Sequence, residues 1–154
     1  MSTIAESIKV LFENYSKDPI SSIDKLPQSG SDRMYYRIKT AKKSFIATFN
    51  KNIKENKTFV SFSKTFKNAG APVPEIYAVN DEGNIYIQQD LGDISLLSEL
   101  EKYGYDDRLF ELYKKSLKSL AALQINADKE LDYNSCITSK EFGQQSILSD
   151  LLYF

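Results

Sequence analysis

The sequence contains no histidine, and this absence narrows its possible chemistry more than any other feature. Without an imidazole, Ser-His-Asp catalysis, Cys-His catalysis and histidine general-base chemistry are all excluded. Nearly all zinc sites are excluded as well, because they rarely form from carboxylates alone. Any chemistry in this chain must therefore use carboxylates, amides and backbone groups.

Cysteine, long apolar runs and excess charge of one sign are also scarce. The single cysteine, Cys136, cannot form an internal disulfide and is expected to be a structural or incidental thiol. The N-terminus lacks a basic segment followed by an apolar one, and no run approaches the roughly 18 apolar residues that span a bilayer. With 20 basic and 21 acidic residues, the formal charge of -1 favours neither nucleic acid nor an anionic membrane as partner. We expect a soluble, cytoplasmic protein.

The composition is that of one globular domain, because 154 residues with 42% hydrophobic content can bury a core of ordinary size. A helix is predicted up to Tyr15, since Thr3 and Glu6 have capping-box spacing and apolar residues then recur at helical intervals. Turn residues and alternating apolar residues follow. Together they predict strands over residues 20–26, 34–38 and 44–49.

After Asn52 the apolar period changes from about two residues to about 3.6. Three phenylalanines share one helical face, Glu55 lies in the first turn and Gly70 follows the last, which predicts a helix from Glu55 to Asn68. Prolines at 72 and 74 prevent this helix from continuing.

The remaining elements are a hairpin and a helical segment. Two antiparallel strands are predicted over residues 76–79 and 85–88, and the chain beyond Asp93 is expected to be helical. A leucine stripe follows Asp106 and Asp107, and a last helix is expected to open at residues 138–141. The predicted fold class is α+β, with one five-stranded antiparallel sheet followed by helices.

This order of elements resembles the N-lobe of protein kinases and of aminoglycoside/choline kinase-like phosphotransferases. Three segments make the resemblance more specific: residues 26–37 (LPQSGSDRMYYR), Glu55-Asn56 with residues 72–77 (PVPEIY), and residues 89–93 (QDLGD). Together they look like a bacterial phosphotransferase group related to the N-acetylmuramate/N-acetylglucosamine anomeric sugar kinases. The similarity covers residues 26–97 and continues weakly to residues 150–154 (DLLYF), which resemble an internal C-lobe helix.

The resemblance implies two domains. Residues 1–93 would form a kinase-like N-lobe with an added N-terminal helix, and residues 94–154 would begin a C-lobe that continues beyond this chain. The implied cofactor is ATP, with magnesium in the complete enzyme. The small-molecule acceptor would bind largely through the lobe that this chain lacks.

The resemblance also implies a loop that covers the nucleotide phosphates. Ser29, Gly30 and Ser31 are small, so their backbone N–H groups could approach phosphate oxygens closely. Arg33 would add positive charge, although a solvated arginine at a strand end fits its position equally well. Without the resemblance, these small residues would be an ordinary hairpin turn.

The base of the nucleotide would lie at the connection after the fifth strand. Gln89, Asp90 and Leu91 would present backbone groups to the adenine edge, and the small side chain of Ala47 would leave room for the ring. The alternative for Ala47 is packing in the core. Asp93 is expected to cap the next helix rather than to bind a ligand.

The sequence departs from the family at the residues that hold phosphate. Kinases pair a lysine on the third strand with a glutamate on the next helix, but here the lysine position falls on Phe49 or Thr48. Glu55 could be the helix glutamate, with Lys51 or Lys54 as its partner, or it could be a solvated first-turn residue. No histidine or Asp-x-Asp occurs, so no catalytic base and no metal site can be assigned.

The sequence leaves two classes of function open. The chain is either the nucleotide-binding portion of a small-molecule phosphotransferase, with a sugar as the favoured acceptor and no activity alone, or a non-catalytic pseudokinase-like binding module. Either class could form a homodimer through its C-terminal helices, because apolar residues form a stripe there that can cover itself across a two-fold axis. The stripe consists of Ile147, Leu148, Leu151 and Leu152, and Tyr153 and Phe154 follow it directly.

Overall fold

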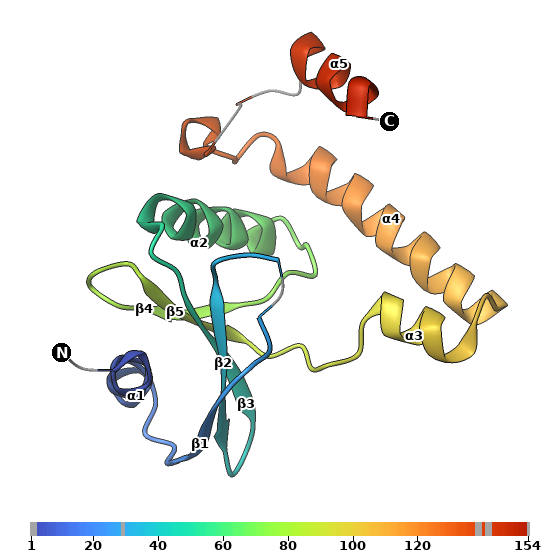
Figure 1. Cartoon of the computed structure of the whole chain (residues 1–154). Coiled ribbons are helices and arrows are strands. Elements are labelled where there is room, and N and C mark those ends of the chain that lie inside the picture. The colour runs from blue at the N-terminus through green and yellow to red at the C-terminus, as the bar shows by residue number, and fades with distance from the viewer. Residues whose placement is uncertain (1–2, 29, 138–139, 141–142, 154) are drawn as a thin grey trace.

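The computed structural model describes residues 3–28, 30–137, 140 and 143–153. Over these residues the fold is α+β, as predicted, and Figure 1 shows a sheet with flanking helices followed by a helical segment. The elements are α1 (Ile4–Tyr15), β1 (Ile20–Lys25), β2 (Met34–Thr40), β3 (Ser44–Phe49), α2 (Ile53–Asn68), β4 (Ile76–Val79), β5 (Ile85–Gln89), α3 (Leu96–Tyr103), α4 (Asp107–Ala127), the short 3₁₀ helix η1 (Tyr133–Ser135) and α5 (Gln144–Tyr153).

The five strands found in the described residues form one antiparallel sheet in the order β1-β2-β3-β5-β4. The register places Tyr36 of β2 opposite Ala47 of β3, and Ala47 opposite Ile87 of β5. Because side chains alternate along a strand, these three residues share one face of the sheet. The prediction of a five-stranded antiparallel sheet is confirmed, and the described residues after Asp93 contain no strand.

Helix α1 covers this face and builds most of the core. Its capping box is present, with Glu6 N–H donating to Thr3 Oγ1 over 3.2 Å. Ile8 and Phe12 are fully buried, and the Phe12 ring meets Phe45 edge to face with 5.0 Å between centroids. The buried cluster under α1 consists of Ile8, Phe12, Tyr36, Ile38, Phe45, Ala47, Ile85 and Ile87.

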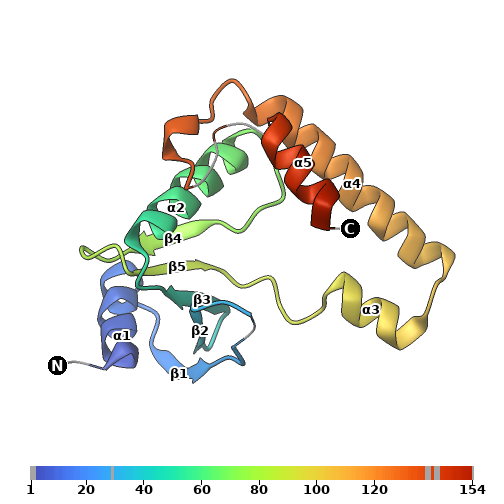
Figure 2. The same ribbon diagram turned by 45° about the horizontal axis from the view of Figure 1, so that its top comes forward.

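Helix α2 lies on the opposite side of the sheet from α1 (Figure 2). It starts at Ile53, two residues before the predicted start, because the Asn52 side chain accepts from Glu55 N–H and caps the helix there. Its Phe59 ring stacks on Tyr86 of β5 with 5.2 Å between centroids. Helix α1 buries the larger apolar core of the sheet, and α2 makes a smaller, more polar contact with it.

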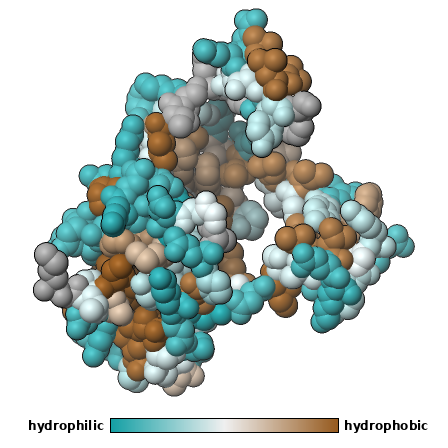
Figure 3. Space-filling view, viewed as in Figure 1, coloured by the Kyte–Doolittle hydropathy of each residue, from teal (hydrophilic) through white to brown (hydrophobic). Residues whose placement is uncertain are grey.

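The helices after the sheet form an arm with many exposed apolar side chains. Helix α3 packs against α4, which continues past α2, and none of the residues of α5 is buried. Figure 3 shows apolar surface over α5 at the top of the view. The expected start of the last helix at residues 138–141 falls outside the described residues except for Lys140, and α5 begins at Gln144. Within the described residues, no helix combines the length and the apolar character needed to cross a membrane.

Candidate functional site

Three of the predicted nucleotide contacts, Gln89, Asp90 and Leu91, lie at the end of the sheet where β5 passes into α3. A cavity of about 250 Å³ opens there on the face opposite α1. Its wall combines the sheet face of β2, β3 and β5 that points away from α1 with residues 90–95, the connector between β5 and α3. The lining residues are Leu26, Tyr35, Arg37, Ile46, Pro74, Gln88, Gln89, Asp90, Leu91, Gly92 and Asp93. Gln89, Asp90 and Leu91, the residues expected to recognise a base, are therefore brought together at one cavity.

The backbone of this connector is partly engaged and partly open. Gln89 N–H donates to Glu75 O over 2.8 Å, so it is used within the sheet. Gly92 has a φ of 84°, in the region that favours glycine, and its N–H donates to Asp90 Oδ1 over 2.9 Å. Among the described residues, no backbone hydrogen bond engages Leu91, whose side chain is 65% exposed. The backbone of Leu91 is thus available to a ligand in the cavity.

Arg37 fixes the connector to the sheet. Its guanidinium donates to both oxygens of Asp90, at 2.7 and 3.2 Å, and to both oxygens of Asp93, at 2.9 and 2.7 Å. The Arg37 and Asp90 side chains are 15% and 5% exposed, whereas Asp93 is 78% exposed. Such bidentate pairs fix geometry as well as charge, so the connector is held in one position.

The same network shifts the pKa of each partner. Burial works to raise the pKa of Asp90, but hydrogen bonds from Ser44, Gly92 N–H and Arg37 outweigh it and hold that pKa below its ordinary value. The hydrogen bond from Arg37 lowers the pKa of Asp93. The two carboxylates raise the pKa of Arg37, so all three groups are charged near neutral pH.

Asp93 does not cap the next helix as expected. The N-cap of α3 is Ser95, whose hydroxyl accepts from Ser98 N–H over 3.0 Å. The carboxylate of Asp93 instead pairs with Arg37, which lies 56 residues earlier in the chain. An ion pair at that separation leaves no local pattern, so the sequence could not show it.

A second polar cluster lies at the opposite end of the same sheet face, around the loop between β1 and β2. Gly30 has a φ of 42°, Gln28 Nε2 donates to Ser31 O over 2.9 Å, and Arg33 N–H donates to Ser31 Oγ over 3.1 Å. Ser29, the first of the three predicted loop residues, lies outside the described residues. These hydrogen bonds join Gln28 and Arg33 to Ser31 in the described part of the loop.

Arg33 is the partner of Glu55, in place of the Lys51 or Lys54 considered from the sequence. Arg33 Nη2 donates to Glu55 Oε1, and Asn50 Nδ2 donates to Glu55 Oε2 over 2.9 Å. The Arg33 guanidinium also lies over the Phe59 ring, 5.7 Å from its centroid. Glu55 is therefore neither paired with a nearby lysine nor solvated alone.

Burial acts to lower the pKa of Arg33, but the nearby Tyr35 hydroxyl and the charges around it raise the pKa overall. The Arg33 side chain is 23% exposed. It is thus a fixed positive charge on the α2 side of the sheet that still reaches solvent.

Ala47 does not reach the cavity. It is fully buried beneath α1, on the face opposite the lining residues, so its small side chain packs in the core and cannot flank a bound ring. The β3 residue that does line the cavity is Ile46, which is paired with Arg37 and Gln88 across the strands. Thr48, two residues on, shares this face and is fully buried near Tyr86.

Sequence reasoning missed Arg37, Ile46 and Gln88 as lining residues. One signal was available for Arg37, because a long cation between the aromatic and apolar residues 34–36 and Ile38 needs a partner when its strand is buried. No comparable signal marks Ile46, since either face of β3 carries apolar residues.

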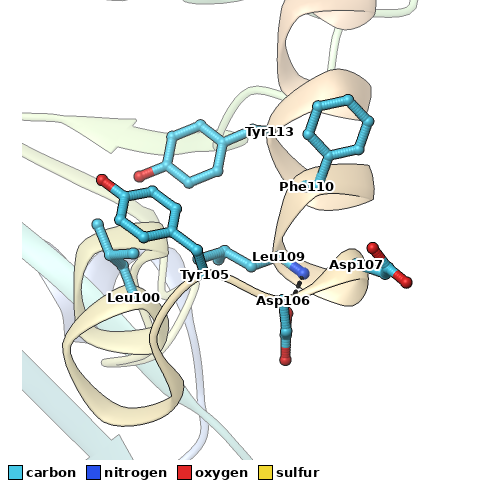
Figure 4. A pocket seen from close by; sticks show the side chains of 7 residues that line it. All are labelled: Leu100, Tyr105, Asp106, Asp107, Leu109, Phe110 and Tyr113. Carbon is cyan, nitrogen blue, oxygen red and sulfur yellow. Dashed lines mark hydrogen bonds between the residues drawn. The ribbon is translucent and has the colours of Figure 1, made fainter.

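A separate hollow of about 540 Å³ lies between α3 and α4 (Figure 4). Tyr105, Phe110 and Tyr113 supply much of its wall, and Asp106 uses its carboxylate to accept from Leu109 N–H over 2.6 Å. None of the predicted nucleotide contacts lies there.

No group of three or more histidine, cysteine, aspartate or glutamate residues that could hold a metal ion occurs in the described part of the chain. Comparison with protein-family models and with curated proteins found no match.

Proposed function

We propose that this chain is the nucleotide-binding portion of an ATP-dependent phosphotransferase that acts on a small molecule, with a sugar as the favoured acceptor. The observation that carries the proposal is the cavity where β5 leaves the sheet. Leu91, whose backbone makes no hydrogen bond in the described residues, and the apolar residue Ile46 both line this cavity. A flat base needs this combination of hydrogen-bonding groups at its edge and apolar contact on its face.

The order of elements supports the same proposal. Three strands, a helix, two strands and a connector into helices is the arrangement on which the resemblance to kinase-like phosphotransferases is based. Phosphoryl transfer depends mainly on positioning and charge stabilisation, with magnesium bridging the phosphates. The chain contains no candidate for the catalytic loop or for the metal ligands, so it would bind ATP without transferring phosphate. An ATP-dependent role also fits the expected cytoplasmic location.

The test is calorimetric titration of the whole chain with ATP and, separately, with adenosine. We expect saturable binding of both, because the base contacts at the connector are common to the two ligands. The proposal would be overturned if neither ligand bound at concentrations up to roughly 1 mM. Such a result would mean that the free energy of binding is weaker than about -4 kcal/mol.

Two variants of matched size locate the binding site. Ile46→Trp would fill the cavity and is expected to abolish binding of both ligands. Leu117→Trp adds the same ring at an exposed position on α4 and should leave both affinities unchanged. Circular dichroism establishes that each variant is folded. If a folded Ile46→Trp variant binds adenosine as tightly as the wild type, the base does not lie in this cavity.

A further inference from the structure

We propose that Arg33 binds the phosphate chain of the nucleotide and that Glu55 positions it, so that this pair replaces the lysine missing from β3. The inference rests on the proposed function and names the residues that recognise the charged end of the ligand. It follows from the different surroundings of the two arginines, Arg33 and Arg37, on one face of the sheet.

Arg37 is not available to a phosphate. Two carboxylates, Asp90 and Asp93, occupy its guanidinium through four hydrogen bonds. The three groups carry a net charge of -1, because two negative charges surround one positive charge. An anion brought to this end of the cavity would be repelled, whereas a neutral base would not.

Arg33 has a single carboxylate partner. A guanidinium has five N–H donors, and Glu55 accepts from one of them at Nη2. The Nε–H of Arg33 is buried without a hydrogen-bond partner in the described residues, and the side chain as a whole still reaches solvent. The buried Nε–H cannot reach a ligand, and the Tyr35 side chain is a second hydrogen-bond partner of Arg33. Two of the five N–H donors therefore remain for a phosphate at the exposed part of the guanidinium.

The spacing of the two arginines suits a nucleotide. Arg33, the residue before β2, and Arg37 within β2 are four residues apart, which corresponds to about 13 Å of extended chain. The base end of the cavity lies beside Arg37, and the loop with Gly30 and Ser31 lies beside Arg33. A ligand whose base is held at the connector would thus extend its phosphates toward the small-residue loop and Arg33.

Glu55 and its neighbours hold the cation in place before any ligand arrives. Glu55 is fixed by Asn50 Nδ2 and by its position in the capped first turn of α2, where Asn52 accepts from Glu55 N–H. Phe59 supports the flat side of the guanidinium. A preorganised side chain loses little entropy when it binds a phosphate.

The inference is tested by comparing ATP with adenosine, since adenosine lacks the phosphates. Arg33→Ala is expected to weaken ATP binding at least about tenfold and to leave adenosine binding within about twofold of the wild type. Glu55→Gln should weaken ATP binding by a smaller factor, because the arginine remains but is held less firmly. The matched control is Arg108→Ala, which removes another paired arginine, bound to Glu99 at 2.6 Å near the start of α4, and should change neither affinity.

The outcomes separate this inference from the proposed function. If the wild type binds neither ligand, the proposed function itself fails. If ATP binds and Arg33→Ala changes its affinity no more than Arg108→Ala does, the proposed function stands and the role of Arg33 is wrong. Arg33→Lys guards against a folding defect, because it keeps the charge and should retain part of the ATP preference while adenosine binding stays unchanged.

Discussion

Two arginines four residues apart, Arg33 just before β2 and Arg37 within it, illustrate how surroundings decide what a residue can do. Arg37 is held by two carboxylates of the connector after β5, and Arg33 is held by one carboxylate of α2. The first arrangement fixes the backbone beside the cavity, and the second leaves a cation with free donors. The same residue type therefore serves as an anchor at one position and as a candidate ligand at the other.

Replacing Arg37 should destabilise the fold. Arg37→Met removes the cation and leaves the nearly buried Asp90 without its charged partner, so we expect the free energy of unfolding to fall by about 2 kcal/mol. Lys39→Met on the same strand is the control. It breaks an exposed pair with Asp24 at 3.0 Å and should cost less than about 1 kcal/mol. Urea denaturation of both variants measures the difference, and equal losses would contradict the anchoring role.

The same network predicts a pH dependence of stability. The pKa values of Asp90 and Asp93 are lower in the folded chain than their ordinary value of about 3.9, so their contribution is complete above that pH. It is lost as the pH falls through the lowered folded pKa values. The stability difference between wild type and Arg37→Met should therefore be constant from pH 7 to about 5 and shrink below about 4. Urea midpoints measured across this range test it; a difference that grows on acidification has the wrong sign.

At the scale of elements, the two helices that flank the sheet have different tasks. Helix α1 closes the apolar face, where Ile8 and Phe12 are fully buried. Helix α2 carries Glu55, Asn56 and Phe59 onto the polar face, where Asn56 Nδ2 donates to Asn50 O and Gly83 O at 3.1 and 2.9 Å. The apolar helix stabilises the sheet, and the polar helix arranges the cluster around Arg33.

Shortening the buried Phe12 side chain of α1 should therefore lower the free energy of unfolding strongly. Phe12→Ala removes a fully buried ring that packs on Phe45, and the expected loss is roughly 3–5 kcal/mol. Val10→Ala on the same helix is the control, because Val10 is exposed and its loss should be below about 0.5 kcal/mol. Thermal and urea unfolding compare them. A small effect of Phe12→Ala would mean that α1 is dispensable for the sheet.

At the scale of the whole molecule, a compact sheet and a loosely packed helical arm differ in how well they bury apolar surface. The described residues of α5 are all unburied, and α4 exposes Phe110, Leu117 and Leu120. Each such side chain is worth roughly 1.5–3 kcal/mol when it is fully buried. Contiguous exposed apolar surface of this kind usually marks an interface.

We predict that the purified chain self-associates through α5. Its exposed residues Ile147, Leu148 and Leu151 can cover the same residues of a second copy across a two-fold axis. Light scattering over a dilution series should show a mass above that of the monomer at high micromolar concentration. The double variant Leu148→Glu, Leu151→Glu should be monomeric, whereas Gln145→Glu, at an exposed polar position of α5, should not change the mass. A wild type that stays monomeric would disprove the interface.

We also predict that the chain alone shows no phosphotransferase activity. Charge stabilisation by magnesium and positioning of the acceptor both need residues for which the sequence offers no candidate. Coupled ATPase and sugar-kinase assays on the purified chain measure this directly. Turnover that survives repurification and follows the protein peak would show that the chain carries a catalytic site of its own.

The sequence by itself determined the type and order of the elements up to β5 and the helical character of the segment that follows, although α3 and η1 were not predicted as separate elements. Helical and strand periods are local, so the capped start of α1, the end of α2 before Gly70 and the hairpin of β4 and β5 were all predicted within a few residues. It also placed Gln89, Asp90 and Leu91 together, because neighbours in a short connector cannot separate.

Tertiary structure decided which side chains face the cavity and which charges pair. In β3 both faces carry apolar residues, so the sequence pattern does not show which face is turned toward the cavity. A register shifted by one residue would place Ala47 there instead of Ile46. Arg33 meets Glu55 from 22 residues away, and Arg37 meets Asp90 from 53 residues away. Those pairings exist because the sheet register and the placement of α2 bring distant segments together, and no local pattern encodes that distance.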